Sequence, residues 1–205
     1  MGVVISLAFI ALVFFFLLYQ RLKRTPGSSR GLQIAVKCAA TSMAALVALL
    51  GCLRIGAPAH WLLFAGLIIC TIADGVICVY FLPGGAIFVL GHIMYMISFW
   101  MMHRPDWRCL LLLLCLMGVI TIGINHLRVS KNRGLIYAYA AVLSLMVSLA
   151  AFQTPLILAG ALLFAFSDGL LGYLAIKGDA TYLDYISLGA YYLGQFLLAL
   201  GTHFY

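Results

Sequence analysis

Long apolar runs, separated by links of a few mostly polar residues, constrain this chain more than any other feature of its sequence. A helix needs roughly 20 apolar residues to cross a bilayer. Eight runs are close to that length, near residues 2–19, 32–51, 60–80, 84–102, 109–125, 135–152, 154–175 and 183–203. With 66% of its residues hydrophobic and 8% charged, a water-soluble fold of 205 residues could not bury this apolar surface. The sequence predicts an all-α integral membrane bundle of about eight transmembrane helices, in a single domain over residues 1–205.

The basic residues lie mainly in the links and predict the orientation of the chain. No basic residue precedes the first run, which indicates an uncleaved start anchor with its N-terminus outside. If successive spans alternate in direction, one side of the membrane has eight basic residues, namely Arg21, Lys23, Arg24, Arg30, Arg128, Lys131, Arg133 and Lys177. The other side has three, namely Arg54, Arg104 and Arg108. The positive-inside rule then places both termini outside, in what we expect to be a bacterial inner membrane. The net charge of +7 is accounted for by topology and lipid headgroups, so we expect membrane lipids and no nucleic acid as partners.

A short internal repeat links two of the spans. Residues 66–75, GLIICTIADG, resemble residues 160–169, GALLFAFSDG, at an offset of 94 positions, with Gly, Asp and Gly in register. The third and seventh spans are four apart and therefore run in the same direction. Two parallel four-helix halves would produce this pattern.

Ionisable residues inside the spans are the strongest functional signal, because a charge at mid-span costs roughly 2.5–3.5 kcal/mol. Four charged or histidine side chains lie five or more residues from a span end, Lys37, Asp74, His92 and Asp168. Counted from the inner ends of their spans at about 1.5 Å per residue, all four lie about 8–12 Å below the inner membrane surface. Tyr191 and Gln195 extend the same layer. The sequence predicts a polar pocket inside the bundle, open to the cytoplasmic leaflet.

Several of these residues also have a purely structural interpretation. Lys37 can extend to the interface as an anchor, and His92 can serve as a hydrogen bond between helices. Tyrosines near span ends commonly form an interfacial belt. Four phenylalanines either line an acyl slot or pack against one another, namely Phe88, Phe99, Phe164 and Phe166. The two aspartates favour function, because they occupy matching positions of the repeat at one depth.

On these residues the chain resembles the YhhN-type lysoplasmalogenase family of multi-span membrane proteins. The resemblance covers about residues 32 to 200. Its pieces are Lys37, Gly66 with Asp74, the stretch F-x-x-G-H-x-x-Y at Phe88, Gly91, His92 and Tyr95, then Tyr137 or Tyr139, residues 160–164 with Ser167 and Asp168, and finally Tyr191, Tyr192 and Gln195. Two positions depart from the family pattern: Cys38 stands where proline is usual, and Ala73 where glycine is usual. The resemblance implies a lysophospholipid substrate, whose vinyl ether bond is hydrolysed to a fatty aldehyde and glycerophosphoethanolamine or glycerophosphocholine.

The chemistry of a vinyl ether indicates what such a site must contain. Protonation of the carbon β to the oxygen creates an oxocarbenium ion, water adds, and the hemiacetal collapses to aldehyde and alcohol. Glycosidases meet a similar demand with two carboxyl groups. A buried carboxyl group without a cation tends to stay protonated, whereas one beside a cation stays ionised. We expect Asp74 and Asp168 to be this catalytic pair, in either order.

The other polar residues of the layer are expected to bind substrate or to support the pair. Lys37 and His92 are either charge partners of the aspartates or phosphate clamps. The remaining candidates for substrate binding are Tyr95, Tyr139, Ser167, Tyr191 and Gln195. We expect no cofactor and no metal, since the sequence contains no H-x-x-x-H or H-E-x-x-H pattern and no C-x-x-C pair.

Three rival functions fit parts of the same pattern. The main alternative is a small lipid or metabolite transporter or lipid-binding membrane protein, because carriers also combine parallel halves with ionisable groups deep in the bundle. A zinc-dependent lipid hydrolase would need three clustered ligands, and only His92 and His126 approach the pocket. A retinal protein would use Lys37 as a Schiff base beside Asp74, and would be coloured.

Overall fold

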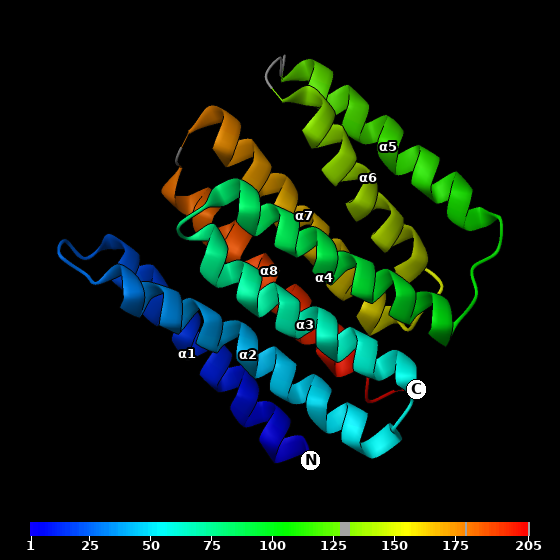
Figure 1. Cartoon of the computed structure of the whole chain (residues 1–205), viewed down its shortest axis with the longest axis horizontal. Coiled ribbons are helices and arrows are strands. Elements are labelled where there is room, and N and C mark those ends of the chain that lie inside the picture. The colour runs from blue at the N-terminus through cyan, green and yellow to red at the C-terminus, as the bar shows by residue number, and fades with distance from the viewer. Residues whose placement is uncertain (128–131, 179, 205) are drawn as a thin grey trace.

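In the computed structural model, the described residues, 1–127, 132–178 and 180–204, form eight α-helices and no strand (Figure 1). The helices are α1 (Gly2–Arg24), α2 (Arg30–Ile55), α3 (Pro58–Ile77), α4 (Phe81–Met102), α5 (Arg108–His126), α6 (Arg133–Ala150), α7 (Pro155–Lys177) and α8 (Thr181–Gly201). The all-α bundle predicted from the apolar runs is confirmed, and each helix matches one run with its ends shifted by a few residues.

Seven of these eight helices, α1 to α7, are long and apolar enough to cross a membrane, so the chain is a multi-pass membrane protein. Helix α8 is more polar, with Asp184 in its first turn and Gln195 buried further along. It packs against α1, α2, α3 and α7. Because protein rather than lipid surrounds much of α8, this helix does not need an apolar surface all round.

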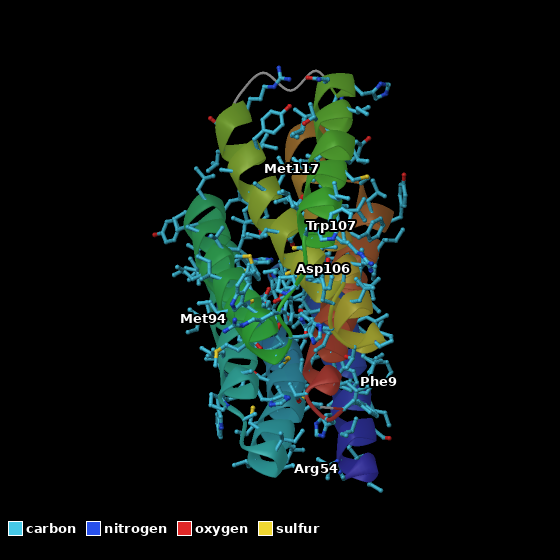
Figure 2. The ribbon with its side chains drawn as sticks, turned by 90° about the vertical axis from the view of Figure 1, so that its right-hand side faces the viewer. Phe9, Arg54, Met94, Asp106, Trp107 and Met117 are labelled. Atoms are coloured by element: carbon cyan, nitrogen blue, oxygen red, sulfur yellow. The ribbon has the colours of Figure 1, made fainter. Side chains whose placement is uncertain are left out.

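The surface of the bundle is apolar, as contact with lipid requires. Phe14, Leu114 and Ile122 are among its large exposed side chains. Figure 2 shows Phe9 and Met94 on opposite flanks of the bundle, with apolar side chains projecting outward.

Contacts between helix ends define two ends of the bundle. At one end, which we call the basic end, the Lys23 Nζ donates to Asp184 Oδ1 at 2.9 Å and so joins α1 to α8. At the opposite end the Gln153 side chain donates to the Phe99 carbonyl at 3.0 Å. The termini share this opposite end (Figure 1). Six of the eight residues counted toward the inner face lie in or next to the basic end, and Arg128 and Lys131 lie outside the described residues.

Two helix pairs, α3 with α4 and α7 with α8, bring their backbones nearly into contact at glycines. A Cβ placed on Gly66 would lie 3.1 Å from the Gly91 carbonyl oxygen, and one on Gly91 would lie 3.3 Å from the Gly66 carbonyl oxygen. The same reciprocal approach joins Gly160 and Gly194, at 2.8 and 2.9 Å. Small residues at such crossings are what allow close packing in membranes.

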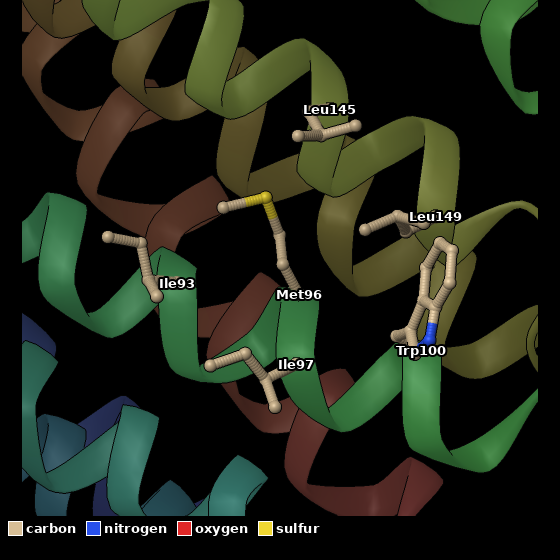
Figure 3. A pocket seen from close by; sticks show the side chains of 6 residues that line it. All are labelled: Ile93, Met96, Ile97, Trp100, Leu145 and Leu149. Carbon is tan, nitrogen blue, oxygen red and sulfur yellow. The ribbon is translucent and has the colours of Figure 1, made fainter.

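The two halves of the chain, α1–α4 and α5–α8, pack in corresponding ways. The repeat glycines Gly66 and Gly160 both sit at these close crossings, and α2 packs on α8 as α6 packs on α4. The halves differ at their first helix: α1 contacts both α2 and α8, whereas α5, within the described residues, packs on α6 alone. The seam between α4 and α6 therefore carries an apolar hollow of about 280 Å³, lined by Ile93, Met96, Ile97, Trp100, Leu145 and Leu149 (Figure 3).

The glycine crossing predicts a stability difference within one helix. Gly160→Ala should destabilise the protein by about 1–3 kcal/mol, because its methyl group would meet the Gly194 carbonyl and the Leu198 amide nitrogen, both at 2.8 Å. Thermal unfolding in detergent measures this as a lower Tm. Gly172→Ala, also on α7, is the matched control, since no atom lies within 4 Å of its added Cβ. Equal Tm values for the two variants would contradict the close crossing.

Candidate active site

A cavity of about 330 Å³ extends from the basic end into the bundle. Its outer part is lined by charged side chains, including Lys23, Arg30 and Asp184, and its inner part reaches Asp74 and Asp168. Between them the wall has apolar residues, namely Ile77, Phe81, Phe88, Leu171 and Leu188. A molecule with a charged head and an apolar chain matches this change of lining.

Asp74 lies fully buried on α3 and is held by three other side chains. The Lys37 ammonium is 3.2 Å from its Oδ1. Thr41 donates a hydrogen bond to its Oδ2 at 2.5 Å, and Tyr191 donates to the same oxygen at 2.7 Å. One cation and two hydroxyl donors favour the ionised carboxylate. Asp74 is thus arranged as a fixed negative charge on the cavity wall.

Helix geometry explains why these partners meet. Lys37 and Thr41 are four residues apart and share a face of α2, and Tyr191 and Gln195 are related in the same way on α8. Gln195 donates to the Tyr191 hydroxyl at 3.3 Å, and accepts from the Tyr95 hydroxyl at 2.7 Å. Tyr95 and Gln195 do not line the cavity, so they support Tyr191 from behind.

Asp168 lies on α7 and has a different environment. The Tyr139 hydroxyl donates to its Oδ2 at 2.6 Å. The His92 Nε2 lies 3.9 Å from the same oxygen, beyond hydrogen-bonding distance. His92 Nδ1 is 2.5 Å from the Phe88 carbonyl, which can only accept, so Nδ1 carries the hydrogen. Within the described residues Nε2 has no hydrogen-bond partner.

The two carboxyl groups therefore face one cavity in contrasting settings. Asp74 is paired with a lysine, whereas no lysine or arginine in the described part of the chain forms an ion pair with Asp168. The Asp168 side chain is 7% exposed. Without a paired cation, a carboxyl group buried to this extent favours its protonated form. The arrangement can keep a negative charge at one point and hold a transferable proton at another.

The structure also places the remaining predicted residues. Ser167 lines the cavity, and its carbonyl accepts from Ser187 at 2.9 Å. Of the two tyrosines considered in α6, Tyr139 reaches the site, whereas the Tyr137 ring lies 5.8 Å from the Arg133 guanidinium.

The phenylalanines divide among three environments. Phe88 lines the cavity, Phe99 and Phe164 are buried in the core, and Phe166 is 52% exposed on the surface. An acyl slot made of all four is therefore wrong, because the Phe88 and Phe164 rings pack against each other at 6.2 Å between centroids, whereas Phe166 is exposed on the surface.

Several residues in or beside the cavity were not identified from the sequence. Thr41 could have been found, because it lies one turn beyond Lys37 on the same face. The wall also includes Tyr19, Gln33 and Ser187, whose side chains have no distinctive pattern in the sequence. Lys23 and Arg30 entered the prediction only as indicators of topology, and Asp184 was not predicted to be part of the site. Across residues 1–127, 132–178 and 180–204, no three His, Cys, Asp or Glu side chains form a metal-binding group.

Comparison with known proteins gives a family. The model of the YhhN family matches residues 32–202, a range that contains every site residue from Lys37 to Gln195. No curated protein and no solved structure matches the chain.

The buried ion pair predicts a coupled effect on stability. Lys37→Met should destabilise the protein by about 3–5 kcal/mol, because the Asp74 carboxylate would remain buried without its cation. Adding Asp74→Asn should restore much of the lost Tm. Lys23→Met is the control, since that lysine is 38% exposed in its pair with Asp184 and should change stability by at most about 1 kcal/mol. Additive losses in the double variant would contradict the pairing.

Proposed function

The chain belongs to the YhhN family, and on that premise we propose that it is an intramembrane hydrolase of lysoplasmalogens. The reaction would cleave the vinyl ether bond and release a fatty aldehyde with glycerophosphoethanolamine or glycerophosphocholine. The observation that carries the proposal is the pair of carboxyl groups, Asp74 and Asp168, in opposite electrostatic settings on one cavity. Such a pair meets the two demands of the reaction, a proton and a negative charge.

The shape and lining of the cavity suit a lysophospholipid. This substrate has one apolar chain and a charged headgroup, and the cavity has apolar walls below a charged mouth. A substrate entering from the basic end would keep its headgroup near Lys23 and Arg30. Its ether linkage would then lie deeper, at the level of the aspartates.

Asp168 would act as the proton donor. It has no paired lysine or arginine among the described residues, and the Tyr139 hydroxyl fixes its Oδ2. Transfer of its proton to the carbon β to the ether oxygen would break the C=C π bond and leave an oxocarbenium ion. Asp168 would become a carboxylate as the substrate becomes positive, so the two charges would stabilise each other.

Asp74 would stabilise the cation throughout the reaction. Its charge is fixed by Lys37, Thr41 and Tyr191, so little reorganisation is needed when positive charge develops on the substrate. Lys37 is then a positioning residue for Asp74, and Tyr191, supported by Gln195, is another.

Addition of water would complete the reaction and restore the site. The newly formed Asp168 carboxylate, which lines the cavity, can accept a hydrogen bond from that water, and the unprotonated Nε2 of His92 lies 3.9 Å from the Asp168 Oδ2. Water forms the new C–O bond to the oxocarbenium carbon, and its proton returns to Asp168. Collapse of the hemiacetal breaks the bond to the glycerol oxygen, which takes the hydroxyl proton, so one water is consumed overall.

We also propose that the cavity opens to the cytoplasmic leaflet of a bacterial inner membrane, with both termini outside. Support comes from the described basic residues. Six of them lie toward the basic end, namely Arg21, Lys23, Arg24, Arg30, Arg133 and Lys177. Three lie toward the opposite end, namely Arg54, Arg104 and Arg108.

Asp74→Asn and Asp168→Asn should each reduce turnover by about a hundredfold or more, because each removes one of the two carboxyl functions. Aldehyde release from a lysoplasmalogen, followed by mass spectrometry, measures this. Asp106→Asn is the control, since Asp106 lies in the link after α4 at the opposite end of the bundle.

Wild-type turnover in either cavity variant would overturn the paired-carboxyl scheme. Absence of aldehyde with the native protein, together with uptake of lipid into proteoliposomes, would favour the transporter.

The orientation can be tested with a reporter. Alkaline phosphatase fused after the C-terminus should be active in intact bacterial cells, because it folds only outside the cytoplasm, and the same enzyme inserted at Ser28 should be inactive. The reverse result would place the cavity mouth on the outer face.

A further inference from the structure

The mouth of the cavity contains an acidic side chain with an unused acceptor. Asp184, in the first turn of α8, lines the cavity together with Lys23 and Arg30. Its Oδ1 accepts from Lys23 Nζ at 2.9 Å. Its Oδ2 is buried and, among the described residues, has no hydrogen-bond partner. One oxygen of this carboxylate is therefore paired with Lys23, and the other is buried without a donor among the described residues.

A buried carboxylate oxygen without a donor is unfavourable, and such groups in native proteins usually have a partner. Lys23 can release the carboxylate at modest cost, because its side chain is 38% exposed and exposed ion pairs contribute little. Asp184 can therefore accept from another N–H donor in place of Lys23. The ligand that fits this position carries a positive charge.

The same mouth presents groups for an anion. Arg30, at the start of α2, and Lys23, near the end of α1, both line the cavity. Guanidinium and ammonium groups bind phosphate well. One acidic and two basic side chains at a single opening complement a ligand that carries both a phosphate and an amine.

We propose that this mouth is a headgroup site selective for phosphoethanolamine, with Asp184 accepting hydrogen bonds from the primary ammonium and Arg30 and Lys23 binding the phosphate. The inference rests on the proposed function only in that the ligand is a lysophospholipid. It adds the headgroup class and the residue that determines it. An ammonium at Asp184 and a phosphate beside it would leave the glycerol and its chain directed inward, toward Asp74 and Asp168.

Selectivity follows from the hydrogen atoms of the ammonium. Ethanolamine has N–H groups for Asp184, whereas the trimethylammonium of choline has none. Recognition of choline relies instead on aromatic ring faces. Four aromatic residues line the cavity, Tyr19, Phe81, Phe88 and Tyr191, and the Tyr19 ring already has the Lys37 ammonium 6.0 Å from its centroid. An anionic headgroup without an amine, such as phosphoglycerol, leaves Asp184 unpaired beside a negative ligand.

The test measures binding to the purified full chain in detergent by isothermal titration. The probes are ester-linked lysophosphatidylethanolamine, lysophosphatidylcholine and lysophosphatidylglycerol of one chain length. The native protein should bind the ethanolamine lipid roughly tenfold more tightly than the choline lipid, as one charge-assisted hydrogen bond would give. Asp184→Asn should reduce this ratio to near one, and Asp106→Asn should leave it unchanged.

Lys23→Gln provides a second test that keeps Asp184. Without its lysine the carboxylate needs a donor more strongly, so the preference for ethanolamine over choline should increase. Arg30→Gln should weaken the binding of all three lipids by about the same factor.

Several results would overturn the headgroup site. These are equal binding of the ethanolamine and choline lipids by the native protein, tighter binding of the glycerol lipid, a preference that survives Asp184→Asn, or a preference that falls in Lys23→Gln. Ester probes have no vinyl ether bond, so this binding result stands whether or not aldehyde is released. Failure of the hydrolase proposal is detected separately, in the aldehyde assay.

Discussion

Two opposite charges buried side by side, on Lys37 and Asp74, determine much of the arrangement around them. Removing both charges from water is costly, and the cost is offset only if each charge meets the other in good geometry and the remaining acceptors are filled. Thr41 and Tyr191 supply those donors, so α2, α3 and α8 must meet at one level. Gln195 and Tyr95 extend the same network to α4. The position of four helices is thus tied to a single carboxylate.

The sequence predicted the depth of the polar residues but not their partners. Depth follows from the number of residues between a side chain and the end of its span, and this placed Lys37, Asp74, His92 and Asp168 in one layer. Which side chains touch depends on how each helix is rotated and on which helices are neighbours. Tyr139 could therefore be predicted as a site residue, but its hydrogen bond to Asp168 could not, and Thr41 was not predicted. Rotation is set by packing, above all at Gly66, Gly91, Gly160 and Gly194, whose reciprocal contacts are visible only in three dimensions.

The two halves of the chain show how one scaffold supports two chemical environments. Asp74 and Asp168 occupy equivalent positions of the repeat, and each lies on a helix that meets its neighbour at a glycine crossing. Equivalent positions around them have diverged. His92 follows Gly91 directly and Gln195 follows Gly194. Phe88 and Tyr191 each precede those glycines by three residues. The phenol of Tyr191 therefore reaches Asp74, and His92 lies near Asp168. Lys37 and Thr41 of α2 complete the difference between the two carboxyl groups.

The crossing of Gly160 and Gly194 has a consequence for how such a protein can change over generations. Each glycine occupies space that a side chain on the other would need, so neither position can accept even a methyl group unless α7 and α8 separate. The same two helices carry Asp168 and Tyr191. A mutation that moves α7 and α8 apart would also displace these two side chains. Selection for stable helix packing and selection for activity therefore act on the same two helices. Substitutions on the sides of these helices that face lipid do not carry this double constraint.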